Sequence, residues 1–287
     1  MKAIYLNTTQ IHSNTDGIGI IVHPDIKGLE MPAIRLPNFD RPNVDGAIVP
    51  NQLYGGRLIS FSGRVYATTV SAYRTLRRTL EQAVAIQRTA GVLYPITLKM
   101  TTMDDLALQV EVYTKAFEFP DKDMLFSTFR MDLFAPSLFL LGQTLKTRNL
   151  YTFFGGGMEI PTAIPMDMNV GGESVDILDN LGNVNANPII TLVGPLNTPT
   201  ITNETTGEAM TISYNLNVNT KRIVIDTEKR TVVYYASLSA AGTNLRSALT
   251  GDFITLAPGN NSVKLTLASY NADGVAQFAW RDSYGGI

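Results

Sequence analysis

Large apolar residues occupy every second position of residues 96–101 and again of residues 106–113. Alternation with a period of two is typical of strands that have one buried face. The segment Met103-Asp104-Asp105 separates the two runs and predicts a turn between them. The pattern therefore predicts a β-hairpin, and a further strand is expected over residues 127–134.

A different spacing, of three and four positions, appears in residues 71–90 and predicts an amphipathic helix. Ser71 is expected to cap its start, and Gly91 is expected to end it in the left-handed conformation. The apolar face is formed by Tyr73, Leu76, Leu80, Ala83 and Val84.

The same helix carries Arg74, Arg77, Arg78 and Arg88, mostly away from the apolar face. These arginines fit a solvated face. They also fit a basic surface against an acidic neighbouring subunit, and the sequence leaves both interpretations open.

The remaining chain alternates short apolar runs with turn-forming residues. Residues 1–60 predict short strands joined by long loops. From residue 210 onward, strands follow one another at intervals of about ten residues, as in a β-sandwich or jelly roll. The fold class predicted from the whole pattern is mainly β, with one helix and a long hairpin in the first half.

Composition changes near residue 150. Residues 1–150 carry 16 basic and 13 acidic residues, whereas residues 151–287 carry 7 basic and 12 acidic ones, and asparagine rises from 6 to 14. Three glycines at 155–157 are followed by Pro161 and Pro165. We expect an N-terminal domain at 1–150, a linker at 151–165 and a C-terminal domain at 166–287.

Composition also limits the classes of function that this protein can have. The 287 residues include no cysteine and only two histidines, and the net charge is −2. Disulfides, thiolate metal sites and cysteine nucleophiles are excluded, and general nucleic-acid affinity is not expected. No apolar run reaches the length of a membrane helix, and we expect a soluble protein made in the cytoplasm. Charged residues, at 17 %, are few for a monomer and favour a surface partly covered by other subunits.

Motifs for chemistry are weak. Gly17-Ile18-Gly19 lacks the remainder of a dinucleotide fingerprint, and no P-loop sequence occurs. His12 and His23 have no nucleophile motif near them. Asp104-Asp105 and the pair Asp121 and Asp123 lie in predicted turns, where aspartate is expected for backbone reasons. We therefore predict no enzyme activity and no cofactor.

The sequence contains two candidate binding sites. Residues 176–187 are rich in Asp and Asn, whose oxygens could bind calcium. Their spacing, however, does not match that of an EF-hand. Exposed aromatic residues of a sandwich can bind glycans, yet Trp280 shares one side of an alternating strand with Phe278. We expect both to pack in the core.

The second half carries a specific order of short segments: 188–191, 194–195, 199–208, 223–227, 230–232, 247–251, 256–261 and 280–282. This order resembles the C-terminal domain of siphophage distal tail proteins, the phage tail domain or minor tail protein family. Through Gly55-Gly56-Arg57, the helix, the hairpin and Phe134-Ala135-Pro136, the first half resembles the same family more loosely.

The resemblance implies a virion protein at the distal end of the tail. Its N-terminal domain, β-sandwich or split-barrel-like, would close a hexameric ring. The C-terminal domain would be a galectin-like β-sandwich. Partners implied are the tail tube protein, the tape measure protein, the tail-tip hub and possible receptor-binding proteins or fibres. No catalytic residue is carried over.

Two groups of residues follow from this interpretation. Candidate oligomer-interface residues are Arg74, Arg77, Arg78, Arg88, Thr101, Asp104 and Asp105. Turn and core positions of the sandwich are Thr205, Gly207, Asp226, Arg230, Pro258, Gly259 and Trp280. Residues 234–243 form a longer loop than the family usually has. A carbohydrate-binding adhesin is the alternative function, and a glycan-cleaving enzyme is disfavoured.

Overall fold

The computed structural model describes residues 1–12, 18–41, 43–49, 51–89, 91–121, 123–151, 174–268 and 274–287. The chain divides into two compact units: the first comprises Met1–Gln143 and Tyr284–Ile287, and the second comprises Thr144–Ser283. Except for Tyr151, the expected linker at 151–165 lies outside the described residues. No described helix is long and apolar enough to cross a membrane.

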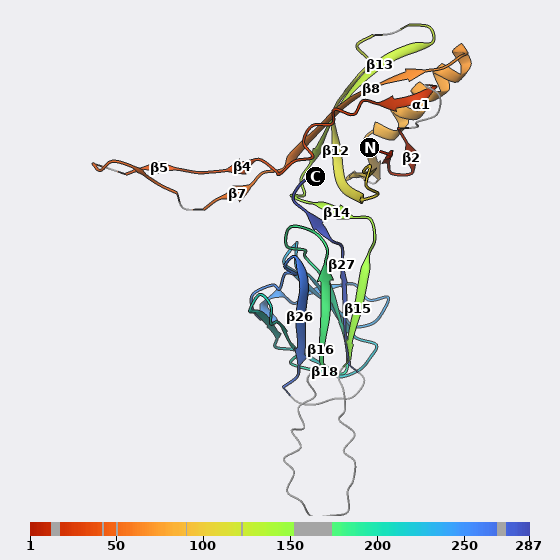
Figure 1. The fold of residues 1–287 in the computed structure, drawn as a ribbon. Helices are drawn as coiled ribbons and strands as arrows, with labels where there is room; N and C mark the ends of the chain where they lie inside the picture. The colour runs from red at the N-terminus through yellow and green to blue at the C-terminus, as the bar shows by residue number, and fades with distance from the viewer. Residues whose placement is uncertain are drawn as a thin grey trace, which may run out of the picture. The chain divides into compact units, whose positions relative to one another are not determined.

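The first unit is built on a nine-stranded sheet (Figure 1). Its main path runs β2-β1-β11-β12-β13-β8-β3, and β14 pairs with β12 and β28. The strands are β1 (Ala3–Leu6), β2 (Thr9–Gln10), β3 (Gly19–Val22), β8 (Arg57–Tyr66), β11 (Ile96–Thr101), β12 (Ala107–Glu118), β13 (Phe126–Ala135), β14 (Leu140–Gly142) and β28 (Ser283–Tyr284).

The predicted hairpin and the following strand are confirmed as β11, β12 and β13. Ile96 pairs with Val112 and Thr101 with Ala107, so the alternating apolar residues share one face. The register between β12 and β13 shifts at Thr114, which bends the long strand β12. The buried faces of these strands and of β1, β3 and β8 enclose one core with the helix.

The helix α1 (Val70–Val84) is shorter than predicted. Thr69, not Ser71, caps its start by accepting a hydrogen bond from the Ala72 amide at 3.2 Å. Its last carbonyl, on Val84, accepts a 2.8 Å hydrogen bond from the Thr114 hydroxyl of β12. The next residue, Ala85, has an extended backbone conformation. Because β9 (Gln87–Thr89) pairs with β10 (Val92–Tyr94), Gly91 takes its positive φ in that hairpin instead of at a helix end.

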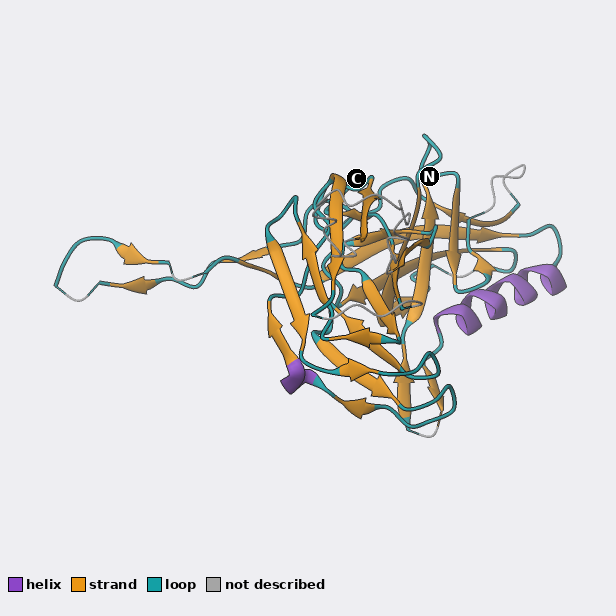
Figure 2. Cartoon of the chain, turned by 90° about the horizontal axis from the view of Figure 1, so that it is seen from below, coloured by secondary structure: helices purple, strands orange, loops and turns teal. Residues whose placement is uncertain are grey.

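Between β3 and β8 the chain leaves the body of the first unit as a narrow two-stranded arm (Figures 1 and 2). Near the body β4 (Ile34–Arg35) pairs with β7 (Leu53–Tyr54), and farther out β5 (Phe39–Asp40) pairs with β6 (Ala47–Ile48). The arm comprises residues 33–54. The sequence predicted short strands and loops here, and the pairing of the strands into a projecting arm was not predicted.

The second unit has two principal sheets, of six and five strands, that share one core. A short 3₁₀ helix, Arg246–Ala248, precedes β25. The sheet of six contains β15 (Lys146–Tyr151), β27 (Val275–Trp280), β17 (Ile189–Val193), β22 (Arg222–Asp226), β23 (Thr231–Tyr235) and β24 (Thr243–Asn244). The sheet of five contains β16 (Ser174–Asn180), β26 (Gly259–Thr266), β19 (Thr200–Asn203), β20 (Glu208–Ile212) and β25 (Leu249–Gly251), and β18 (Leu196–Asn197) pairs separately with β21 (Asn215–Leu216).

The mainly β fold class predicted from the sequence is confirmed. The division between the units differs from the expected residue 150, because β15 pairs along its whole length with β27 and so belongs to the second unit. The last four residues return to the first unit, where Tyr284 packs against the core.

Candidate assembly surfaces

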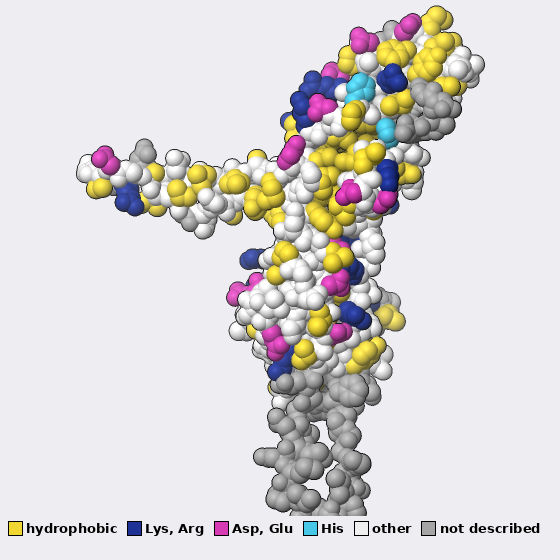
Figure 3. Space-filling view, in the orientation of Figure 1, with side chains coloured by type: hydrophobic (Ala, Val, Ile, Leu, Met, Phe, Trp, Pro, Cys, Tyr) yellow, Lys and Arg dark blue, Asp and Glu magenta, His cyan; other side chains and the backbone are white. Residues whose placement is uncertain are grey.

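The arm exposes apolar side chains along its length. Phe39 is 63 % exposed and Val44 is 64 % exposed, and both lie in its outer half. Figure 3 shows apolar side chains distributed over the arm. The nine large apolar residues exposed between positions 31 and 54 are Met31, Ile34, Leu36, Phe39, Val44, Ile48, Val49, Leu53 and Tyr54.

An isolated pair of strands is marginally stable in water, and every residue of the arm whose exposure is described is exposed. The arm also contains Pro37, two residues before β5. Proline beside a short strand limits the continuous edge pairing that leads to aggregation. An exposed apolar segment protected in this way is typical of a surface that another chain covers.

The root of the arm is held by a buried arginine. Arg57, the first residue of β8, is 3 % exposed. Its Nη2 donates to the carbonyl oxygens of Leu138 at 2.7 Å and Gly285 at 2.8 Å, and its Nη1 donates to that of Gly28 at 3.3 Å. Burial lowers the pKa of Arg57, and the nearby charge of Glu30 opposes that shift. One guanidinium thus connects both ends of the arm segment to the C-terminal tail.

Backbone contacts complete the root. The Gly55 amide donates to the Ala33 carbonyl at 2.7 Å, and the Ile287 amide donates to the Leu29 carbonyl at 3.1 Å. Gly28 has a φ of +84°, and a Cβ there would lie 2.0 Å from the Leu58 carbonyl oxygen. Glycine is therefore required where the chain turns into the arm. The sequence places Arg57 in the Gly55-Gly56-Arg57 segment but does not predict its burial, because an arginine at a strand start gives no signal of burial.

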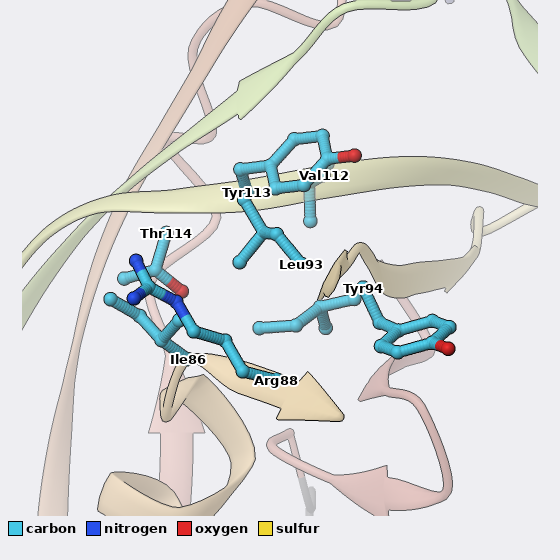
Figure 4. A pocket seen from close by; sticks show the side chains of 8 residues that line it. Ile86, Arg88, Leu93, Tyr94, Val112, Tyr113 and Thr114 are labelled. Atoms are coloured by element: carbon cyan, nitrogen blue, oxygen red, sulfur yellow. The ribbon is translucent and has the colours of Figure 1, made fainter. Parts of the chain in front are cut away.

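A small apolar groove lies elsewhere on the first unit, beside the β9–β10 hairpin. Its cavity volume is about 90 Å³, and its lining includes Ile86, Leu93 and Tyr94, which are 64 %, 45 % and 47 % exposed. Figure 4 shows the Arg88 side chain extending beside Thr114 and the Tyr94 ring on the other side of the groove in that view. The groove is lined by Ile86, Arg88, Leu93, Tyr94, Ile96, Val112, Tyr113 and Thr114.

The structure separates the four candidate arginines. Arg74 and Arg78 are exposed on α1, and Arg88 lines the groove. Arg77 makes contacts within its own unit: its Nε lies 3.0 Å from Glu81, and its guanidinium lies 4.5 Å from the centre of the Phe119 ring. The hydrogen bond to Glu81 raises the pKa of Arg77. Arg77 therefore has a local packing role, which the helical pattern alone did not distinguish.

The candidate residues of the β11–β12 hairpin lie at its turn. The Thr102 hydroxyl donates to Asp104, and this hydrogen bond lowers the pKa of the Asp104 carboxyl. Asp105 has a φ of 65°, and its carboxylate accepts from Lys2 Nζ at 2.5 Å. Thr101 pairs with both Ala3 and Ala107. These contacts shape the turn and join it to β1.

The sequence-predicted positions of the second unit fall in turns and in the core. Gly207, Gly259 and Arg230 have φ values of 77°, 92° and 54°. Asp226 accepts a 2.9 Å hydrogen bond from the Lys229 amide within its turn. Thr205 accepts from the Ser262 amide, Pro258 is exposed before β26, and Trp280 is 3 % exposed in the core.

Buried asparagines connect the loops of the second unit. Asn261 donates to the carbonyls of Ala257 at 2.8 Å and Gly259 at 3.1 Å, and it accepts from Asn203 at 3.1 Å. Asn180 donates to the Val184 and Leu256 carbonyls at 2.8 and 3.0 Å. Buried backbone groups need such partners, so part of the asparagine enrichment in this half serves loop structure.

The stretch considered for calcium makes protein contacts. Asp179 and Asp282 accept from Lys146 Nζ at 2.6 and 2.8 Å, and Asp176 lies 3.6 Å from Arg148. The hydrogen bond from Lys146 lowers the pKa of Asp179. Among the described residues, no group of three His, Asp or Glu side chains has the arrangement of a metal site.

The chain thus consists of two β units, and the first of them carries an exposed apolar arm. Residues 181–284 match the family model of the siphovirus-type tail component, C-terminal domain. No curated protein matches the chain. The resemblance of the second half to siphophage distal tail proteins is confirmed over residues 181–284.

One solved structure extends the likeness over nearly the whole chain. The crystal structure of the SPP1 Dit protein, titled a paradigm of the hub adsorption apparatus in phages infecting Gram-positive bacteria, has a TM-score of 0.57 and 14 % identity, with 98 % of each chain covered. Two structures of the phage P2 baseplate in its activated conformation, with Ca and with Sr, each have a TM-score of 0.47, 9 % identity and 97 % coverage of each chain. The chain therefore shares the fold of SPP1 Dit.

Proposed function

We propose that this protein is a structural component of the distal end of a phage tail. In this role it forms a hexameric ring that joins the tail tube to the tail tip and serves as a platform for receptor-binding proteins or fibres. The match of residues 181–284 to the tail-component family and the shared fold support a tail location. The tail tube protein, the tape measure protein and the tip hub are its proposed neighbours.

The observation that carries the ring is the arm. Its eight large apolar residues, from Ile34 to Tyr54, are on average about half exposed. Fully burying one such side chain contributes roughly 1.5–3 kcal/mol, so covering the arm contributes on the order of 10 kcal/mol. Association itself costs roughly 4–15 kcal/mol. The net free energy of a single arm contact is therefore close to zero. A closed ring gives every subunit two such contacts and is therefore more stable.

The adhesin alternative has less support. Trp280, the strongest candidate for an aromatic sugar platform, lies in the core with its Nε1 donating to the Asp179 carbonyl at 2.9 Å. Tyr214 and Tyr234 pack against each other, with ring centres 5.1 Å apart, and against the core. We therefore assign the second unit a structural and docking role.

The test is the oligomeric state of the purified full chain, measured by mass photometry and negative-stain electron microscopy. We expect closed six-membered rings. The variant Phe39→Ser/Val44→Ser should lose rings in favour of monomers. The matched control Val175→Ser/Ile177→Ser changes two residues of the second unit that are 53 % and 54 % exposed, and it should keep the rings. A wild-type chain that stays monomeric at its highest soluble concentration would overturn the proposal.

A further inference from the structure

We infer that the arm of one subunit docks into the groove beside the β9–β10 hairpin of a second copy of this chain. This inference rests on the proposed ring and names the two surfaces that close it. The arm is the protruding partner, and the groove is the receiving one.

The two surfaces are placed for head-to-tail contact. Both belong to the first unit. Figures 1 and 2 show the arm and α1 on opposite sides of that unit, and the groove begins two residues after α1 ends. Different surfaces on opposite sides of one subunit generate a ring when the rotation between copies closes.

The chemistry of the two surfaces matches. The groove has a mainly apolar lining and a volume of about 90 Å³, roughly three times the share of one water molecule in the liquid. That space suits one large side chain, and Phe39 and Val44 are the most exposed large apolar residues of the arm. Arg88 borders the groove, and Asp45 follows Val44 in the arm, so the pair brings opposite charges together.

A second copy satisfies both surfaces at once. In a closed ring every arm covers one groove, and every groove receives one arm. A different tail protein on the arm would leave Ile86, Leu93 and Tyr94 of the groove uncovered on every subunit. The complementary pair on one chain therefore favours self-association as the occupant.

The absence of cysteine allows a direct test. Single variants Val44→Cys in the arm and Leu93→Cys in the groove are mixed, assembled and treated with a short bismaleimide. We expect covalent dimers from this mixture, at a yield at least ten times that of Val44→Cys mixed with Ser62→Cys. Ser62 is exposed on β8 of the same unit and is the matched control.

The outcomes separate this inference from the proposed ring. Rings that form without arm-to-groove dimers, or with equal dimer yield at Ser62→Cys, would overturn the docking site and leave the ring intact. A chain that forms no rings would overturn both. As a second readout, Asp45→Arg and Arg88→Glu should each reduce ring assembly, and the double variant should restore it. Failure of the double variant to restore rings refutes the charge pairing across the contact.

Discussion

Replacing Arg57 with methionine tests the root of the arm. Methionine retains an unbranched apolar stem but has no donors for the Leu138, Gly285 and Gly28 carbonyls. Two of the three hydrogen bonds are short, and leaving a buried acceptor unsatisfied costs roughly 1–3 kcal/mol. Removing a buried charge offsets part of that loss. We expect Arg57→Met to lower the free energy of unfolding of the first unit by about 2–4 kcal/mol.

The two units can be followed separately during unfolding in urea. Trp280 is the only tryptophan and lies in the second unit. Its fluorescence should therefore be unchanged in the variant while the far-UV circular dichroism transition moves to lower urea. Hydrogen exchange should increase at Ile287, whose amide donates to Leu29 at the arm root.

The control is Arg64→Met, which removes an exposed arginine from the same strand. A substitution at an exposed site of this kind is expected to change stability by at most about 0.5 kcal/mol. If the free energy of unfolding of Arg57→Met lies within that same margin of the wild-type value, the guanidinium does not stabilise the root of the arm. A shift confined to the Trp280 transition would equally refute the reasoning.

Three further predictions concern single residues. His12 accepts a hydrogen bond from the Val22 amide through Nδ1, and burial lowers the pKa of His12 below 6.5. The free energy of unfolding of the first unit should therefore decrease as the pH falls from 6.5. The variant His12→Gln should remove this pH dependence, and an equal dependence in the variant and the wild type would contradict the reasoning. Asn261→Ala should destabilise the second unit by about 2–4 kcal/mol, as measured by the Trp280 transition. The control Asn260→Ala, at the exposed neighbouring residue, should leave the stability unchanged. Similar losses in both variants would show that the buried hydrogen bonds of Asn261 do not stabilise the unit. Thr69→Ala should cost the first unit about 1 kcal/mol through the lost helix cap, and no change in its urea midpoint would show that the cap is dispensable.

Local patterns in the sequence were enough to predict much of the β structure. The hairpin of β11 and β12 follows from strict alternation, because a period of two places every second side chain on one face. The core position of Trp280 follows from the same rule applied to β27. The distal-tail resemblance came from the order of short segments in the second half.

Tertiary structure decided the features that join distant residues. The end of α1 depends on the Thr114 hydroxyl, 30 residues after Val84. Arg57 is explained only by carbonyls at residues 28, 138 and 285. The pairing of β15 with β27 moves the boundary between the units. Local sequence determines the conformational preferences of neighbouring residues. Hydrogen bonds between residues 29 to 228 positions apart exist only after the core has brought those segments together. The exposed arm is likewise defined only by its contrast with the buried strands of the same unit.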